Sequence, residues 1–70
     1  MNKFDKIKTY FLDALKSGES KIITFCEFEE IAGVKPDHSF LRYKKELTEC
    51  GIDVRISLKE STMTFYKNKD

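Results

Sequence analysis

The sequence contains few of the residues that cross-link small proteins or bind metals. Its 70 residues include two cysteines, Cys26 and Cys50, and one histidine, His38. A zinc site uses ligands at short paired spacings, and the chain has no CxxC pair, so no metal site is expected. The lack of a disulfide framework fits a reducing compartment. We therefore expect a cytoplasmic chain in which both cysteines are small buried hydrophobic residues.

Long apolar runs and catalytic motifs are absent as well. No stretch approaches the roughly 18 apolar residues that cross a membrane. The N-terminal stretch MNKFDK carries an acidic residue and precedes no long apolar segment, so we expect no signal peptide. The chain has no glycine-rich phosphate loop and no Ser/His/Asp grouping, and a deep pocket is hard to build in 8.2 kDa. We expect neither an enzyme nor a cofactor, a small-molecule substrate or a membrane partner.

The composition predicts one folded domain, residues 1–70. Hydrophobic residues make up 40% and charged residues 36%, with six phenylalanines and three tyrosines. A disordered chain of this size would have fewer aromatic residues and a more one-sided charge. The net charge is +1, but residues 1–33 carry −1 and residues 34–70 carry +2. This uneven distribution mildly favours the second half as a nucleic-acid surface.

The first half predicts two helices and a short strand. Residues 20–24 contain the β-branched residues Ile22 and Ile23 and predict a strand. Thr24 and Glu27 form a capping-box pattern that begins a helix over residues 25–32, which Gly33 ends. A first helix over residues 3–16 is predicted by apolar residues at helical spacing, namely Phe4, Ile7, Phe11, Ala14 and Leu15. The core residues predicted in the second helix are Phe25, Phe28, Ile31 and Ala32.

The second half predicts a helix and then a hairpin. Pro36 lies in the turn and pre-sets the first turn of a helix over residues 37–50, which Gly51 ends. The buried face of this third helix is predicted to carry Phe40, Tyr43, Leu47 and Cys50. The apolar period then changes to two, in Ile52, Val54, Ile56, Leu58, Met63 and Phe65. A break at residues 59–61 without Gly or Asn predicts a hairpin that lacks a tight two-residue turn.

This order of elements predicts the fold class. Helix, short strand, helix, turn, helix and hairpin form an α+β winged helix-turn-helix, with three helices, a short strand and a C-terminal β-hairpin wing. The final alternating run disfavours a helix bundle. In such a domain the N-terminal half of the third helix enters the DNA major groove, and the wing contacts the backbone.

The candidate nucleic-acid-binding residues follow from this placement. On the third helix they are His38, Ser39, Leu41, Arg42, Lys44 and Lys45, and on the hairpin they are Arg55, Lys59 and Lys67. An arginine can form paired hydrogen bonds to guanine, and a lysine more often contacts phosphate. The alternative is that these residues form the solvated faces of an ordinary helix and hairpin. The sequence leaves both interpretations open.

A second group of residues suggests a protein-binding face. Glu27, Glu29 and Glu30 would be repelled by phosphates, so they lie either in solvent on the far side or against a basic protein partner. A chain this small would read only a short DNA site, so a homodimer or a partner protein is expected. Tyr10 and Leu12 on the first helix are the candidate dimer contacts.

Part of the sequence resembles known families. Residues 33–52, GVKPDHSFLRYKKELTECGI, look like the second half of many bacterial winged-helix modules. Residues 39–56, SFLRYKKELTECGIDVRI, are similar to the C-terminal part of the replication initiators of filamentous phages and related plasmids. The matching residues are Phe40, Arg42, Lys44, Lys45, Leu47, Gly51, Ile52 and Asp53. The resemblance covers under a third of the chain and includes no nicking motif, so it implies a DNA-associated accessory module of phage or mobile-element origin.

Two functions follow as hypotheses. The first is binding of double-stranded DNA by a small phage- or mobile-element-type protein, either in regulation of transcription or as a replication accessory. The second is a protein-interaction module, such as a phage-encoded inhibitor of a host or defence protein, that uses the same fold without nucleic acid. The near-zero net charge and the acidic second helix favour the second hypothesis.

Overall fold

Three helices and three strands make up the part of the chain that the computed structural model describes, residues 3–69. The elements of this part are α1 (Asp5–Ala14), β1 (Ser20–Thr24), α2 (Phe25–Ala32), α3 (His38–Glu49), β2 (Ile52–Ser57) and β3 (Thr62–Lys67). Met1, Asn2 and Asp70, which are the ends of the predicted domain, lie outside the described residues. The radius of gyration of 11.0 Å agrees with the value of about 11 Å expected for a compact domain of this length.

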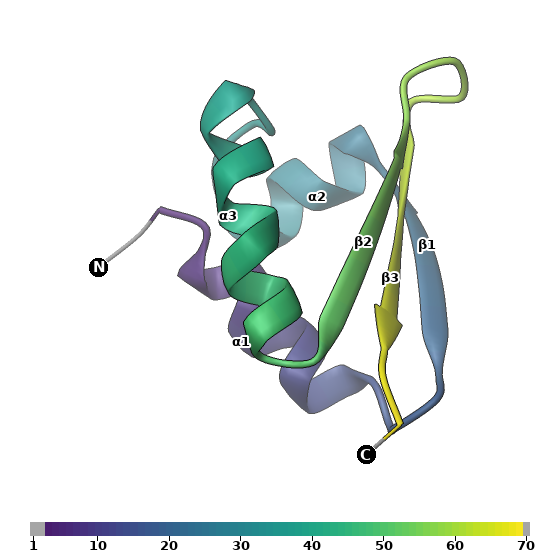
Figure 1. The fold of residues 1–70 in the computed structure, drawn as a ribbon. Helices are drawn as coiled ribbons and strands as arrows, with labels where there is room; N and C mark the ends of the chain where they lie inside the picture. The colour runs from purple at the N-terminus through teal and green to yellow at the C-terminus, as the bar shows by residue number, and fades with distance from the viewer. Residues whose placement is uncertain (1–2, 70) are drawn as a thin grey trace.

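The strands form one antiparallel sheet in the order β1-β3-β2. The last strand, β3, is central and pairs with β1 on one side and β2 on the other, with Thr64 opposite both Ile22 and Arg55. The helices pack on one face of this sheet, and the β2–β3 hairpin projects beyond them (Figure 1). The element order and strand pairing are consistent with winged-helix topology, so the predicted fold class is confirmed.

Local signals determine where α2 begins and ends. The Glu27 amide donates to Thr24 Oγ1 at 3.1 Å, and Glu27 Oε1 accepts from the Thr24 amide at 3.0 Å. These are the two hydrogen bonds of a capping box, which satisfy donors that the first helical turn leaves free. Gly33 ends the helix with φ 77°, a left-handed conformation that favours glycine. The predicted strand 20–24 and helix 25–32 are therefore confirmed to the residue.

The other two helices are shorter than predicted. α3 begins at His38 because Asp37 is extended, with φ −135°, and its carboxylate accepts from the Ser39 amide at 2.9 Å as an N-cap. Pro36 thus precedes the cap and does not begin the helix. α1 ends at Ala14, because Leu15 adopts an extended backbone with φ −99° and ψ 136° and turns into the core.

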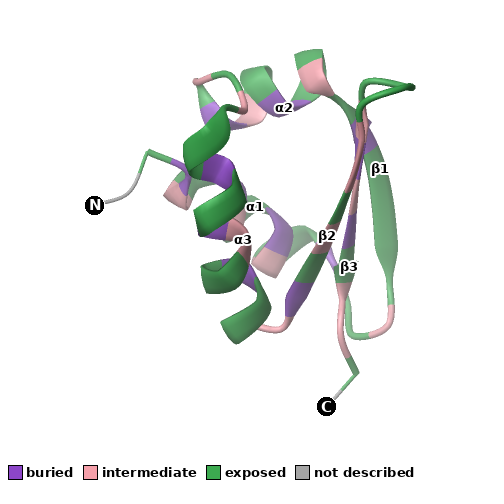
Figure 2. Cartoon of the chain, turned by 45° about the horizontal axis from the view of Figure 1, so that its top comes forward, coloured by how far each residue is buried: buried purple, intermediate pink, exposed green. Residues whose placement is uncertain are grey.

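Phenylalanine rings hold the helices to each other and to the sheet. The Phe4 ring contacts Phe28 and Phe40 at centroid distances of 5.9 and 5.1 Å, so α2 and α3 share this cluster with the start of α1. Phe11 stacks on Phe65 of the central strand at 4.0 Å with an interplanar angle of 13°. Buried positions line the facing sides of helices and sheet, while the outward turns of α3 are exposed (Figure 2).

Several predicted core residues lie in solvent. Cys26 and Cys50 are both exposed, so the prediction that they are buried is wrong. Cys50 caps α3, where the chain turns toward β2 and its side chain leaves the packed face. Leu58 was predicted to continue the buried face of β2, but it is 81% exposed because the strand ends at Ser57 and the four-residue turn lifts it off the sheet. Ala14 also faces solvent.

Candidate nucleic-acid interface

The outward side of α3 carries a basic ridge formed by His38, Arg42 and Lys45. The buried side holds Phe40, Tyr43 and Leu47. At 100° per residue the three ridge positions fall opposite that side. All three are exposed, and within residues 3–69 the side chains of Arg42 and Lys45 form no hydrogen bond and no ion pair. The ridge therefore offers two free cationic groups, Arg42 and Lys45, on the middle turn of the helix, on the side that the sequence predicts to face outward.

Two acidic side chains beside this ridge are paired with lysines from α1 and the segment before it. Lys3 Nζ lies 2.6 Å from Asp37 Oδ2, and Lys8 Nζ lies 3.8 Å from Glu46 Oε2. Both pairs are exposed enough that they contribute little to stability. Their effect on the surface is electrostatic, because they partly neutralise two of the acids near the ridge. Glu49 lies on the same outward side and is exposed, and no ion pair within residues 3–69 neutralises it.

The free amide groups at the start of α3 are capped by the carboxylate of Asp37. Ser39 donates both its amide and its hydroxyl to Asp37 Oδ1. Hydrogen bonds from Lys3 and Ser39 lower the pKa of Asp37 to about 2, so it is anionic at neutral pH. A helix N-terminus is otherwise a favourable place for a phosphate. Here the negative cap already fills it, so phosphate contacts are better placed on Arg42 and Lys45 than on Ser39.

The hairpin residues do not form one surface. Arg55 lies on the face of the sheet away from the helices, opposite Thr64, and Lys59 lies in the exposed turn. Lys67 lies on the inner face, where its ammonium donates to the carbonyl oxygens of Leu12 at 3.0 Å and Leu15 at 3.1 Å. The structure therefore places Lys67 at the C-terminal end of α1, apart from the other predicted nucleic-acid-binding residues.

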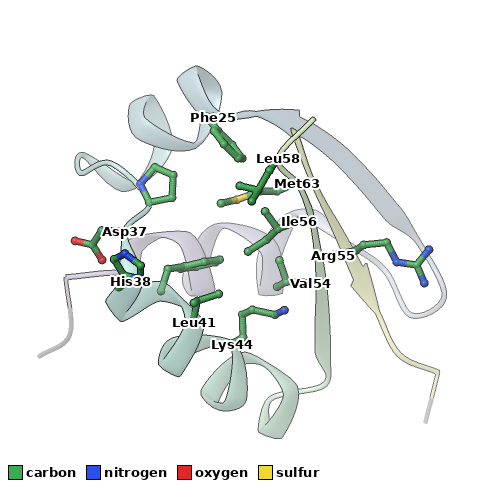
Figure 3. A pocket seen from close by; sticks show the side chains of 12 residues that line it. Phe25, Asp37, His38, Leu41, Lys44, Val54, Arg55, Ile56, Leu58 and Met63 are labelled. Atoms are coloured by element: carbon green, nitrogen blue, oxygen red, sulfur yellow. The ribbon is translucent and has the colours of Figure 1, made fainter. Parts of the chain in front are cut away.

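A wide hollow of about 730 Å³ separates α3 from the hairpin. Its lining is mainly apolar and includes Phe25, Leu41, Val54, Ile56, Leu58 and Met63. Figure 3 shows these side chains around one space, with Lys44 extending from α3 toward Val54 and Arg55 pointing away on the other side of the sheet. Leu41 is 55% exposed, so the predicted DNA-contacting leucine also forms a wall of this hollow.

The sequence did not predict this hollow. The sequence pattern predicts Leu58 on the buried face of the hairpin and Leu41 as a DNA contact. The available signal was the position of Leu58 directly before the polar turn KES, where a strand residue is about to leave the sheet.

The residues of the predicted partner face lie on two helices, α1 and α2. Glu27 closes the capping box, and Glu29 and Glu30 are exposed on α2. Tyr10 contacts Lys21, whose ammonium lies 5.8 Å from the ring centroid, whereas Leu12 packs partly against the core. The two residues are about 200° apart around α1, so they lie on different sides of that helix.

Residues 3–69 contain no candidate metal centre and no membrane-spanning helix. Across the described residues, no group of three or more His, Cys, Asp or Glu side chains is placed to hold a metal ion. In the same range, no helix is long and apolar enough to cross a bilayer. Tyr43 donates its hydroxyl to Asp5 Oδ1 at 2.7 Å, and burial together with this hydrogen bond raises the Tyr43 pKa. This contact joins α3 to α1 and is structural.

The fold and the exposed helix define a small α+β domain of winged-helix topology. Comparison with known proteins does not narrow this class. No protein-family model matches the chain, and no curated protein and no solved structure matches it either.

Proposed function

We propose that this chain is a winged-helix module that binds double-stranded DNA in the cytoplasm, with α3 in the major groove and the hairpin turn on the backbone. It is proposed as a binding module and not as an enzyme. The observation that carries the proposal is the basic ridge of α3, whose Arg42 and Lys45 have no acidic partner within residues 3–69 while Asp37 and Glu46 are paired with lysines. Leu41 on the same helix offers an apolar contact for a thymine methyl group.

The resemblance of residues 39–56 to phage and plasmid replication initiators supports the same proposal. Arg42, Lys44 and Lys45 belong to that resemblance and lie on the exposed or half-exposed sides of α3. A role as a regulator of transcription or a replication accessory in a phage or mobile element follows from it. Lys67 and the first-turn Ser39 are left out of the proposed contact set because their polar groups are occupied.

Titration of labelled duplex DNA at 50 and 200 mM salt tests this function. Four phosphate contacts, from Arg42, Lys44, Lys45 and Lys59, predict a slope of log affinity against log salt of about −3.6, or a loss of roughly 150-fold between these concentrations. Replacing Arg42 and Lys45 together by Gln halves that slope. The matched control is Lys16→Gln, an exposed lysine just after α1, which leaves the slope unchanged.

Two results contradict the proposal that the chain binds DNA through the basic ridge. One is the absence of a complex at 50 mM salt. The other is a complex whose salt slope is the same for the double variant and for Lys16→Gln, because the ridge then takes no part in it.

The apolar hollow favours a second candidate function, protein interaction. Leu41 and Leu58 are 55% and 81% exposed and both line it. Exposed leucines beside a partly open apolar groove are typical of surfaces that bind other proteins. The partner in this case is a host or defence protein, as in the hypothesis of a protein-interaction module drawn from the sequence.

A further inference from the structure

The hollow between α3 and the hairpin continues along the outer edge of β2. A second hollow of about 580 Å³ adjoins the first, and the two share Lys44, Val54 and Arg55. The second hollow reaches Asp53 and Tyr66 on the far face of the sheet. Because β2 is an edge strand, the two hollows together form an edge groove that follows it on both faces. Because the edge groove follows the strand, it can accept an extended segment of polypeptide as well as a single side chain.

The backbone of β2 has hydrogen-bonding groups directed into the edge groove. The Asn68 amide donates to the Gly51 carbonyl at 2.8 Å, which makes these two residues a hydrogen-bonded pair in the β2–β3 register. Hydrogen-bonded pairs alternate along an antiparallel ladder. Asp53, Arg55 and Ser57 thus bond to β3, whereas the N–H and C=O groups of Val54 and Ile56 point away from it. Within residues 3–69, no other segment hydrogen-bonds the backbone of Val54 or Ile56.

The side chains beside this free edge alternate in character. Val54 and Ile56 are half-buried on the inner face and face the apolar hollow, with Leu41 and Leu58 at its mouth. Arg55 lies between them in sequence and faces outward. A strand added here would place every second side chain among apolar groups and the others beside Arg55, because side chains alternate across a strand.

The charge around the edge groove is mainly positive. Lys44 and Arg55 line both hollows, and the basic ridge of α3 lies on the adjacent side of the same helix. Of the acids that line it, Asp37 is paired with Lys3, which leaves Asp53 as the other carboxylate. Charge complementarity therefore favours an acidic occupant over a basic one.

We infer that the edge groove binds an extended segment of a partner protein in which apolar and acidic residues alternate, and that this segment adds to β2 as a further strand. The backbone of Val54 and Ile56 supplies the hydrogen bonds, and the hollow takes the apolar side chains. This is the recognition mode in which main-chain bonds give affinity and pockets give specificity. The inference rests on the second candidate function and names the chemistry of its partner.

The test uses the whole chain and a fluorescein-labelled peptide with four Val-Glu repeats. Binding is measured by fluorescence anisotropy, and amide hydrogen exchange is measured by NMR with and without the peptide. We expect saturable binding and slowed exchange of the Val54 and Ile56 amides. The Asp53 and Arg55 amides, already bonded to β3, change little. This pattern of alternate residues is the signature of an added strand.

Two variants locate the site. Leu58→Glu is expected to weaken binding roughly tenfold or more, because it removes an apolar contact and adds a charge that repels the peptide. The matched control is Ile22→Glu at the other sheet edge, where Ile22 is 64% exposed and lines neither hollow; it should bind the peptide as the unaltered chain does. Both positions are exposed, so both variants are expected to fold.

Other outcomes overturn the inference in distinguishable ways. Binding without protection of Val54 and Ile56, or equally strong binding of a helical peptide of the same charge, leaves a protein-binding groove but excludes strand addition. A peptide in which lysine replaces glutamate and which binds as well excludes the acidic preference. If neither the Val-Glu peptide nor the helical peptide binds, the inference of strand addition fails, whereas the second candidate function fails only if Leu58→Glu also leaves every protein complex of the chain unchanged.

Discussion

Replacing Lys67 by Met tests whether this lysine, on the inner face of the sheet, stabilises the fold. Its role then differs from that of Lys45 on the α3 ridge, which we propose to bind DNA. The substitution keeps the apolar stem and removes the two hydrogen bonds from the ammonium to the Leu12 and Leu15 carbonyls, at 3.0 and 3.1 Å. Hydrogen bonds to a charged group contribute about 1.5–3 kcal/mol each, but these carbonyls are partly exposed and regain water. A cation at a helix C-terminus adds about 0.3–1 kcal/mol.

We therefore expect Lys67→Met to lower the free energy of unfolding by about 1–2 kcal/mol. For a domain of this size that corresponds to a fall in Tm of roughly 5–15 °C, measured by circular dichroism. The matched variant is Lys45→Met, which should change stability by less than about 0.5 kcal/mol because Lys45 is exposed. In the DNA titration the order reverses: Lys45→Met reduces the salt slope by about 0.9, and Lys67→Met leaves it unchanged. An unchanged Tm for Lys67→Met, or a salt slope reduced as in Lys45→Met, would refute this assignment.

Three further perturbations test other contacts. Thr24→Ala breaks the capping box and should lower the free energy of unfolding in urea by about 1 kcal/mol; an unchanged midpoint contradicts the cap. Tyr43→Phe loses the hydrogen bond to Asp5 and should cost about 1 kcal/mol in the same assay. The pKa of Asp37 is lowered from 3.8 to about 2, so its stabilising contribution is present above pH 4 and lost as the pH falls toward 2. Asp37→Asn should show a shallower fall of Tm over this range, and parallel curves contradict this reasoning.

Features encoded by neighbouring residues were predictable from the sequence. The start and end of α2 depend on Thr24, Glu27 and Gly33, which lie within ten residues of one another, and the prediction was correct to the residue. The face of α3 was predictable for the same reason, since apolar spacing alone sets which side is buried. The ridge of Arg42 and Lys45 follows directly from that face.

Features set by contacts between distant segments were not predictable. The hairpin sequence does not show what the Lys67 ammonium contacts. Only the packing of α1 against β3 places this ammonium at the end of a helix. For Leu58 the polar turn that follows it is a partial signal, but the residue at which β2 ends depends on the pairing of β2 with β3. Cys50 has the right helical spacing, but the chain turns at that residue. In each case the spacing of apolar residues predicts which way a side chain points. Whether another segment packs against that side chain depends on the tertiary structure.

The central position of the last strand has a consequence for a chain that grows from its N-terminus. β1 has one strand partner in the sheet, β3. The pair of residues that lies closest along the chain is Thr24 and Thr62. The helices can form from local contacts, but neither edge strand gains its ladder until β3 has been made. The sheet therefore closes in a late, non-local step, in which a long loop must be ordered before pairing offsets its entropy. Until then, β1 exposes Ile22 and Ile23 with all their backbone groups free, so synthesis passes through an interval when this segment is most open to pairing with other chains.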